Sequence, residues 1–219
     1  MIKAIVFDLE GTLFTSKALS QAHLSRIIDL LSKRKQVKNK KALMMLKSRR
    51  ERLAKRLGYT PSLTKTVEVF GISRQEFFEE IAKVDPRDFL KLDAELIETL
   101  RLLRDKGLKI ALLTNVSYEY TKKILRALGV EEIFTHLITG SDVVHVKPAI
   151  EPFQKTLKIL DLNPSHVLMV GDRAEIDLAP AKGLGMKTAL VIKHSKPKDI
   201  NTRIVDIVLH DVGDLIKYF

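Results

Sequence analysis

Hydrophobic positions along the chain follow two periods, and their alternation predicts the fold. Short, near-continuous apolar runs of the kind found in buried strands occupy residues 2–7, 108–113, 133–138, 167–170, 188–192 and 205–209. Helical periodicity separates the later runs, over residues 119–128, 150–160 and a stretch that ends near residue 182. Repeated strand–helix–strand units with near-continuous apolar strands predict a parallel sheet covered by helices on both faces.

The pattern is helical between the first two predicted strands. Apolar residues share helix faces in two stretches, at Leu24, Ile27, Ile28 and Leu31 and at Leu46, Leu53 and Leu57. Residues 58–61 interrupt the pattern, and Asp85-Pro86 ends it because the residue before a proline is disfavoured in a helix. One more helix precedes the second strand and is marked by Leu92, Leu96, Leu100 and Leu103. We therefore predict an α/β protein with a Rossmann-like core at residues 1–15 and 87–219 and an inserted all-α cap at residues 16–86.

Composition places the chain among soluble proteins. The 219 residues are 45% hydrophobic with a mean hydropathy near zero, which supports a sizeable core. No apolar run approaches the ~18 residues that a membrane span needs. The absence of cysteine excludes disulfides and thiolate metal sites and fits a reducing compartment. A cytoplasmic protein without membrane contact is expected.

The basic residues are concentrated in one segment. The chain carries 38 Lys and Arg against 27 Asp and Glu, for a net charge of +11. Between Lys33 and Arg56 stand 12 basic residues and a single acid, Glu51, and the remainder holds 26 of each sign. The segment can be a solvated helix face, a surface that concentrates anionic substrate, or a site for nucleic acid or an acidic partner. It has no aromatic residue to stack on bases, so nucleic acid is not an expected partner.

Polar residues capable of chemistry follow four of the predicted strands. In open α/β sheets, ligands bind outside the carboxyl ends of the strands, so residues at these ends should converge. They are Asp8 and Glu10 after the first strand, Thr114 and Asn115 after the second, Lys147 after the third, and Asp172 and Asp177 after the fourth.

The order and spacing of these residues resemble the haloacid dehalogenase superfamily, in the branch that has a helical cap after the first strand. The resemblance rests on DLEGT at residues 8–12, Thr114, Lys147-Pro148 and GDRAEID at residues 171–177. It covers essentially the whole chain, and four motifs in register at strand ends are a specific signal.

The resemblance implies a covalent phosphatase mechanism. Asp8 would attack phosphorus and form an aspartyl-phosphate that water later hydrolyses. Glu10 lies two residues further along an extended chain, on the same side as Asp8, and would act as general acid and base. Thr114, Asn115 and Lys147 would bind the phosphoryl group.

The same resemblance implies a magnesium site. Asp8 and Asp172 would supply carboxylate oxygens for Mg²⁺, and the Glu10 backbone carbonyl would complete the protein ligands. Asp177 would orient Lys147 or a metal-bound water rather than bind the metal directly.

Glu10 departs from the majority pattern, in which the second acid is an aspartate. Enolase-phosphatases are a branch with glutamate there, and glutamate keeps the carboxylate that proton transfer needs. Dehalogenases of the superfamily use the nucleophilic aspartate without a metal or this second acid, so Glu10 favours phosphate chemistry. We predict a Mg²⁺-dependent phosphatase of a small phosphorylated metabolite. The alternatives are a 2-haloacid dehalogenase and an interaction module that binds nucleic acid or an acidic partner through the basic cap; the sequence indicates neither the substrate nor the oligomeric state.

Overall fold

The chain forms two compact units in the computed structural model, which describes residues 1–193 and 200–219. Residues 1–15 and 90–219 form an α/β core, and residues 16–89 form a helical unit. The sequence predicted that the insertion ends at residue 86, whereas the helical unit ends at Phe89. A 3₁₀ turn, η1 (Pro86–Asp88), begins at residue 86 and belongs to the helical unit.

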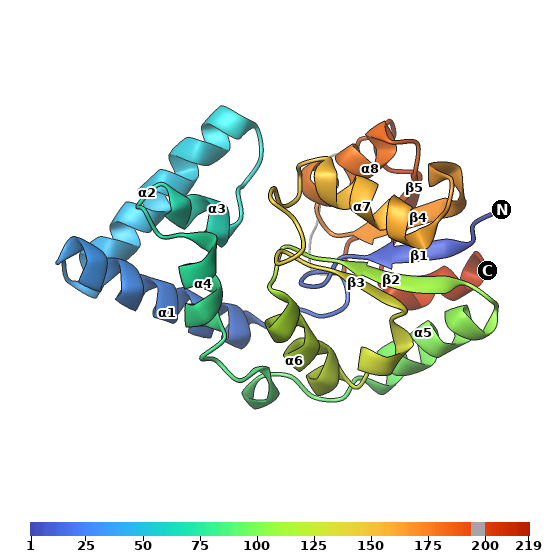
Figure 1. The fold of residues 1–219 in the computed structure, drawn as a ribbon, viewed down its shortest axis with the longest axis horizontal. Helices are drawn as coiled ribbons and strands as arrows, with labels where there is room; N and C mark the ends of the chain where they lie inside the picture. The colour runs from blue at the N-terminus through green and yellow to red at the C-terminus, as the bar shows by residue number, and fades with distance from the viewer. Residues whose placement is uncertain (194–199) are drawn as a thin grey trace. The chain divides into compact units, whose positions relative to one another are not determined.

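The core is built on a six-stranded parallel sheet (Figure 1). Its strands are β1 (Ala4–Phe7), β2 (Lys109–Leu113), β3 (His136–Ile138), β4 (Val167–Gly171), β5 (Lys187–Val191) and β6 (Ile207–Leu209), in the order β3-β2-β1-β4-β5-β6. Ala4 of β1 is in register with Lys109 on one side and Val167 on the other. The strand order reverses between β1 and β4, and in doubly wound sheets the ligand crevice opens at this point. The predicted Rossmann-like α/β class is confirmed.

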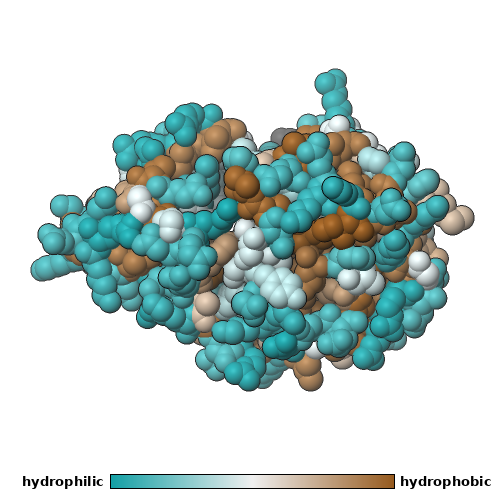
Figure 2. Space-filling model, viewed as in Figure 1, coloured by the Kyte–Doolittle hydropathy of each residue, from teal (hydrophilic) through white to brown (hydrophobic). Residues whose placement is uncertain are grey.

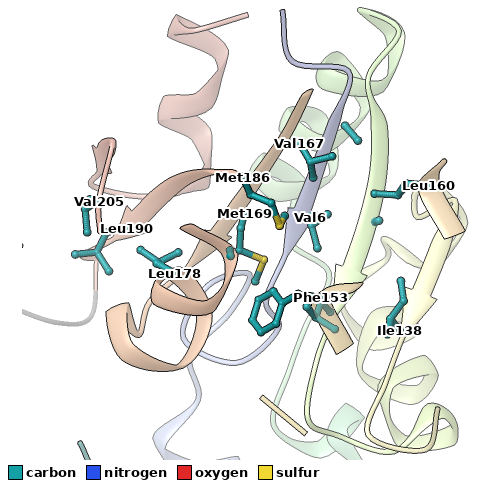
Figure 3. Packing of buried hydrophobic residues seen from close by; sticks show 14 residues of the cluster. Val6, Ile138, Phe153, Leu160, Val167, Met169, Leu178, Met186, Leu190 and Val205 are labelled. Carbon is teal, nitrogen blue, oxygen red and sulfur yellow. The ribbon is translucent and has the colours of Figure 1, made fainter. Parts of the chain in front are cut away.

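Helices cover both faces of the sheet, because the strands are apolar on both sides. In Figure 1, α5 (Ala94–Asp105) and α6 (Tyr118–Leu128) lie on one side, and α7 (Glu151–Leu160) and α8 (Ala179–Gly183) lie on the other. Figure 3 shows part of the second interface, where Phe153 of α7 packs beside Val6 and Met169 of the sheet. These side chains are fully buried and fix the strand ends from which the site residues emerge.

Several predicted elements in the core need correction. The third strand begins at His136 rather than at residue 133, because residues 131–133 form the 3₁₀ turn η2 (Glu131–Ile133). Leu92 is 72% exposed and lies outside α5, since Asp93 caps that helix by accepting from the Leu96 amide. The helix predicted after the fourth strand is two elements, a π-helical turn η4 (Ala174–Leu178) and then α8. The 3₁₀ turns η3 (Pro164–His166) and η5 (Val212–Lys217) were not predicted.

The helical unit contains α1 (Lys17–Lys35), α2 (Asn39–Leu57), α3 (Leu63–Glu68) and α4 (Arg74–Ile81). Ser16 caps α1, and left-handed residues end α1 at Gln36 and α2 at Gly58. The interior of the unit is apolar and includes Ile27, Leu31, Leu46, Leu53, Phe77 and Phe78.

The basic segment lies at the end of α1 and along α2. Most of its charged side chains are exposed, and the visible face of this unit is largely hydrophilic (Figure 2). The three interpretations of this segment stay predictions. Within the described ranges, no helix combines the length and apolarity that crossing a membrane requires.

Candidate active site

Asp8 stands where the first strand ends. Its amide donates to the Val170 carbonyl oxygen at 2.9 Å, which ties the end of β1 to β4. The chain then turns tightly: the Leu13 amide donates to the Leu9 carbonyl oxygen at 2.9 Å. The Asp8 side chain is 12% exposed, so most of the carboxylate is shielded from water while one side remains open.

Lys147 is the centre of the site. Its Nζ donates to Asp8 Oδ1 at 2.6 Å, to Asp177 Oδ1 at 2.7 Å and to the Leu113 carbonyl oxygen at 2.7 Å. An ammonium has three N–H donors, and each of them has an acceptor here. Burial alone would lower the pKa of Lys147, but the charges of Asp177 and Asp8 outweigh it and raise that pKa. The lysine is therefore a fixed positive charge between two strand ends and η4.

This arrangement bears on the predicted role of Lys147. Contact with a phosphoryl oxygen would require the ammonium to exchange one of its three protein acceptors. The Leu113 carbonyl was missed by sequence reasoning, because a backbone acceptor has no signature in residue type.

Asp172 and Asp177 come from the segment after β4. One carboxylate oxygen of Asp8, one of Asp172 and one of Asp177 lie within 4.8 Å of one another. Burial, followed by the charge of Asp8, raises the pKa of Asp172 to about 8. Burial also raises the pKa of Asp177 to about 6, against the opposing effect of Lys147. Burial, more than repulsion between the acids, therefore opposes ionisation of Asp172 and Asp177.

The two aspartates differ in their remaining bonding capacity. Asp177 uses both oxygens, since Oδ2 accepts from the Arg173 amide at 3.2 Å. Asp172 Oδ1 is buried and has no hydrogen-bond partner. Hard anionic oxygens with spare capacity are the ligands that Mg²⁺ prefers. The acidic cluster could hold a divalent cation, and Asp172 is the member with an unused buried oxygen.

Two glycines permit this close packing. A Cβ on Gly11 would lie 2.4 Å from Cγ of Asp172, and Gly11 also has a φ of +94°. A Cβ on Gly171 would lie 2.5 Å from Cβ of Asp177. Any side chain at either position would displace a carboxylate of the site. Gly11 belongs to the DLEGT motif and Gly171 to the GDRAEID motif, but the sequence did not show that the absence of a side chain at these positions makes room for Asp172 and Asp177.

The other predicted residues lie at the same edge of the sheet. Thr114 is buried, its amide donates to the Ile138 carbonyl oxygen at 2.9 Å, and its Oγ1 accepts from the Val116 amide at 3.3 Å. Asn115 bonds to the backbone of Lys147 through its side chain. Glu10 is exposed beyond the end of β1. The structure thus brings Asp8, Lys147, Asp172 and Asp177 together directly.

Fold and site together define a Rossmann-like α/β protein in which the Asp8 carboxylate meets a buried lysine at the carboxyl ends of the strands. A family model described as haloacid dehalogenase-like hydrolase matches residues 2–185, and the chain belongs to that family. The chain is 34% identical to the phosphoglycolate phosphatase of Aquifex aeolicus over 147 residues, which span 66% of this chain and 68% of that protein. It is 32% identical to the pyrophosphatase PpaX of Bacillus cereus over 196 residues, 87% of this chain and 83% of that one. A crystal structure titled as a HAD phosphatase from Thermococcus onnurineus has a TM-score of 0.74 at 25% identity, covering 99% of this chain and 97% of that chain.

Proposed function

We propose that the protein is a Mg²⁺-dependent phosphatase that hydrolyses a small phosphate monoester through an aspartyl-phosphate. The observation that carries the proposal is the contact of Lys147 with both Asp8 and Asp177, beside the partner-free oxygen of Asp172. The relatives named as phosphatases support the same reaction class.

The first step is attack by an Asp8 carboxylate oxygen on phosphorus. A bond forms between that oxygen and phosphorus, the bond from phosphorus to the substrate oxygen breaks, and Glu10 donates a proton to the departing alkoxide. Lys147 holds Oδ1 of Asp8 at 2.6 Å and so limits the rotation of the nucleophile before attack. Its positive charge also offsets the charge of the approaching phosphate.

The second step hydrolyses the acyl-phosphate. Glu10, now ionised, takes a proton from water, the water oxygen bonds to phosphorus, and the bond to Asp8 breaks and restores the carboxylate. The Thr114 hydroxyl at the end of β2 is proposed to donate to a phosphoryl oxygen. Exposure of Glu10 suits a group that must exchange protons with both the leaving alcohol and water.

Magnesium would be held by Asp8, Asp172 and the backbone carbonyl of Glu10, and it would supply positive charge that screens the phosphate from the carboxylates. Asp177 is proposed to keep Lys147 in place, since both of its oxygens bond within the protein. Burial and then the charge of Asp8 raise the pKa of Asp172, and a bound cation would favour its ionised form against both effects.

A panel of phosphate compounds tests the proposal, with phosphoglycolate and an aryl phosphate as monoesters and pyrophosphate as an anhydride. Hydrolysis should require Mg²⁺ and stop with EDTA. Asp8→Asn should abolish turnover, because an amide is not a nucleophile, whereas Asp161→Asn, at an exposed aspartate beyond α7, should keep wild-type activity. Halide release from 2-haloacids without phosphatase activity would replace the proposal with a dehalogenase, and turnover in Asp8→Asn would exclude the covalent route.

A further inference from the structure

Asn115 joins the end of β2 to the loop that carries Lys147. Its Nδ2 donates to the Lys147 carbonyl oxygen and its Oδ1 accepts from the Lys147 amide, both at 2.9 Å. One side chain thus satisfies both backbone polar groups of a single residue, as neighbouring strands do in a ladder. We infer that Asn115 is a positioning residue that holds the Lys147 backbone where Nζ reaches Asp8 and Asp177.

The position of the Lys147 backbone matters because the ammonium has three fixed acceptors. They come from the end of β1, the end of β2 and η4, at 2.6 to 2.7 Å. A backbone shift of about 1 Å would stretch these bonds beyond hydrogen-bonding distance unless the side chain rearranged. The loop therefore needs a restraint close to residue 147 itself.

Other hydrogen bonds hold the loop further away. Glu151 accepts from the amides of Val144 and His145 at 2.8 and 2.9 Å, which fixes the loop two residues before Lys147. Asn115 is the side chain that reaches the Lys147 backbone. The restraint starts two residues after the end of β2 and so ties the loop to the sheet.

The same geometry limits what Asn115 can do for a substrate. Its Oδ1 and one N–H bond to Lys147, which leaves a single N–H for a phosphoryl oxygen. Positioning and substrate binding predict different kinetics. Loss of a positioning residue lowers kcat, whereas loss of a uniform substrate contact raises KM.

The first test does not depend on catalysis. The Lys147 side chain is 2% exposed, so an acylating reagent should modify it slowly in the intact protein, with the partly exposed Lys155 as an internal reference. In Asn115→Ala the labelling of Lys147, followed by peptide mass spectrometry, should be roughly tenfold faster, as expected for losing hydrogen bonds of this strength. Ser141→Ala is the matched control: it removes the 3.2 Å bond from the Tyr118 amide to Ser141 Oγ, which joins the same two segments.

The second test rests on the proposed phosphatase activity. With an aryl phosphate, Asn115→Ala should lower kcat by roughly 10²-fold, the effect of about 1 Å of misplacement, with KM changed less than about threefold. Asn115→Asp keeps the acceptor for the Lys147 amide but sets a carboxylate oxygen against the Lys147 carbonyl oxygen, so Lys147 should again be labelled faster than in the wild type. If the alanine variant does not fold, Asn115→Asp is compared with the wild type in its place.

The outcomes separate the two proposals. Unchanged Lys147 labelling in both Asn115 variants overturns the positioning role, and a raised KM with unchanged kcat and labelling would assign Asn115 to substrate binding instead. If the wild type has no phosphatase activity but Lys147 is still labelled faster in the Asn115 variants, the positioning role is supported and the proposed function is refuted.

Discussion

Replacing Lys147 with methionine removes the cation that joins Asp8 to Asp177 while keeping most of the side-chain volume. The side chains of Lys147 and Asp177 are each 2% exposed, so water cannot take the place of the ammonium without opening the site. Removing one partner of a buried ion pair costs about 3–5 kcal/mol, because the remaining charge stays buried without compensation. Here two carboxylates and the Leu113 carbonyl lose their donor at once. We expect the free energy of unfolding to fall by about 4 kcal/mol, a large share of the ~5–15 kcal/mol typical of a folded protein.

Urea denaturation in EDTA at neutral pH measures this loss, and hydrogen exchange of the β1 and β4 amides assigns it to the core. Lys217→Met is the control, since Lys217 pairs with Asp214 while 75% exposed and its loss should leave the free energy of unfolding nearly unchanged. Asp177→Asn and the double variant complete a cycle, with an expected coupling of about 1–3 kcal/mol. A loss as small as the control's, or no coupling to Asp177, would refute the view that Lys147 compensates buried charge.

Three further predictions concern the metal, the general acid and pH. Mg²⁺ should raise the urea midpoint of the wild type but not of Asp172→Asn, because a cation that binds only the folded state stabilises it; equal shifts would remove Asp172 from the metal site. Glu10→Gln should lower kcat by about 10²-fold or more, and Glu10→Asp should lower it only modestly, so a loss as large as that of Glu10→Gln would show that the longer reach is required. Burial lowers the pKa of His23 to about 4, so the unfolded chain binds more protons between about pH 4 and 6.5 and the free energy of unfolding falls as pH drops through that window. His23→Gln should remove about 1–2 kcal/mol of this loss, allowing for the partial exposure of the ring, and an unchanged pH slope in urea titrations would contradict it.

The sheet could be predicted from the sequence because its strands are buried on both faces. Near-continuous apolar runs such as residues 108–113 leave little choice of element, and polar residues directly after them mark the strand ends. β3 was harder to delimit, since its run begins in the turn Glu131–Ile133 and the strand keeps only three residues.

The contacts within the site depend on three-dimensional proximity that residue types do not encode. Asp8 and Lys147 were both predicted site residues, but the Leu113 carbonyl that shares the ammonium is visible only in the folded chain. Likewise, Asn115 is a plausible ligand for a phosphoryl group by residue type. Its two bonds to the Lys147 backbone follow from the approach of two loops, which spacing along the sequence does not specify.

The placement of β1 in the middle of the sheet constrains how the protein folds during synthesis. Ala4 pairs with Lys109 and Val167, so β1, which is synthesised before the other five strands of this sheet, has no partner until β2 follows and is not flanked on both sides until β4. At about 5–20 residues per second, its backbone N–H and C=O groups stay without strand partners for several seconds or more. The helical unit, whose contacts are local, can form meanwhile. Assembly of Asp8 with Lys147 and Asp177 is therefore a late event in folding, because it requires the segments after β3 and β4.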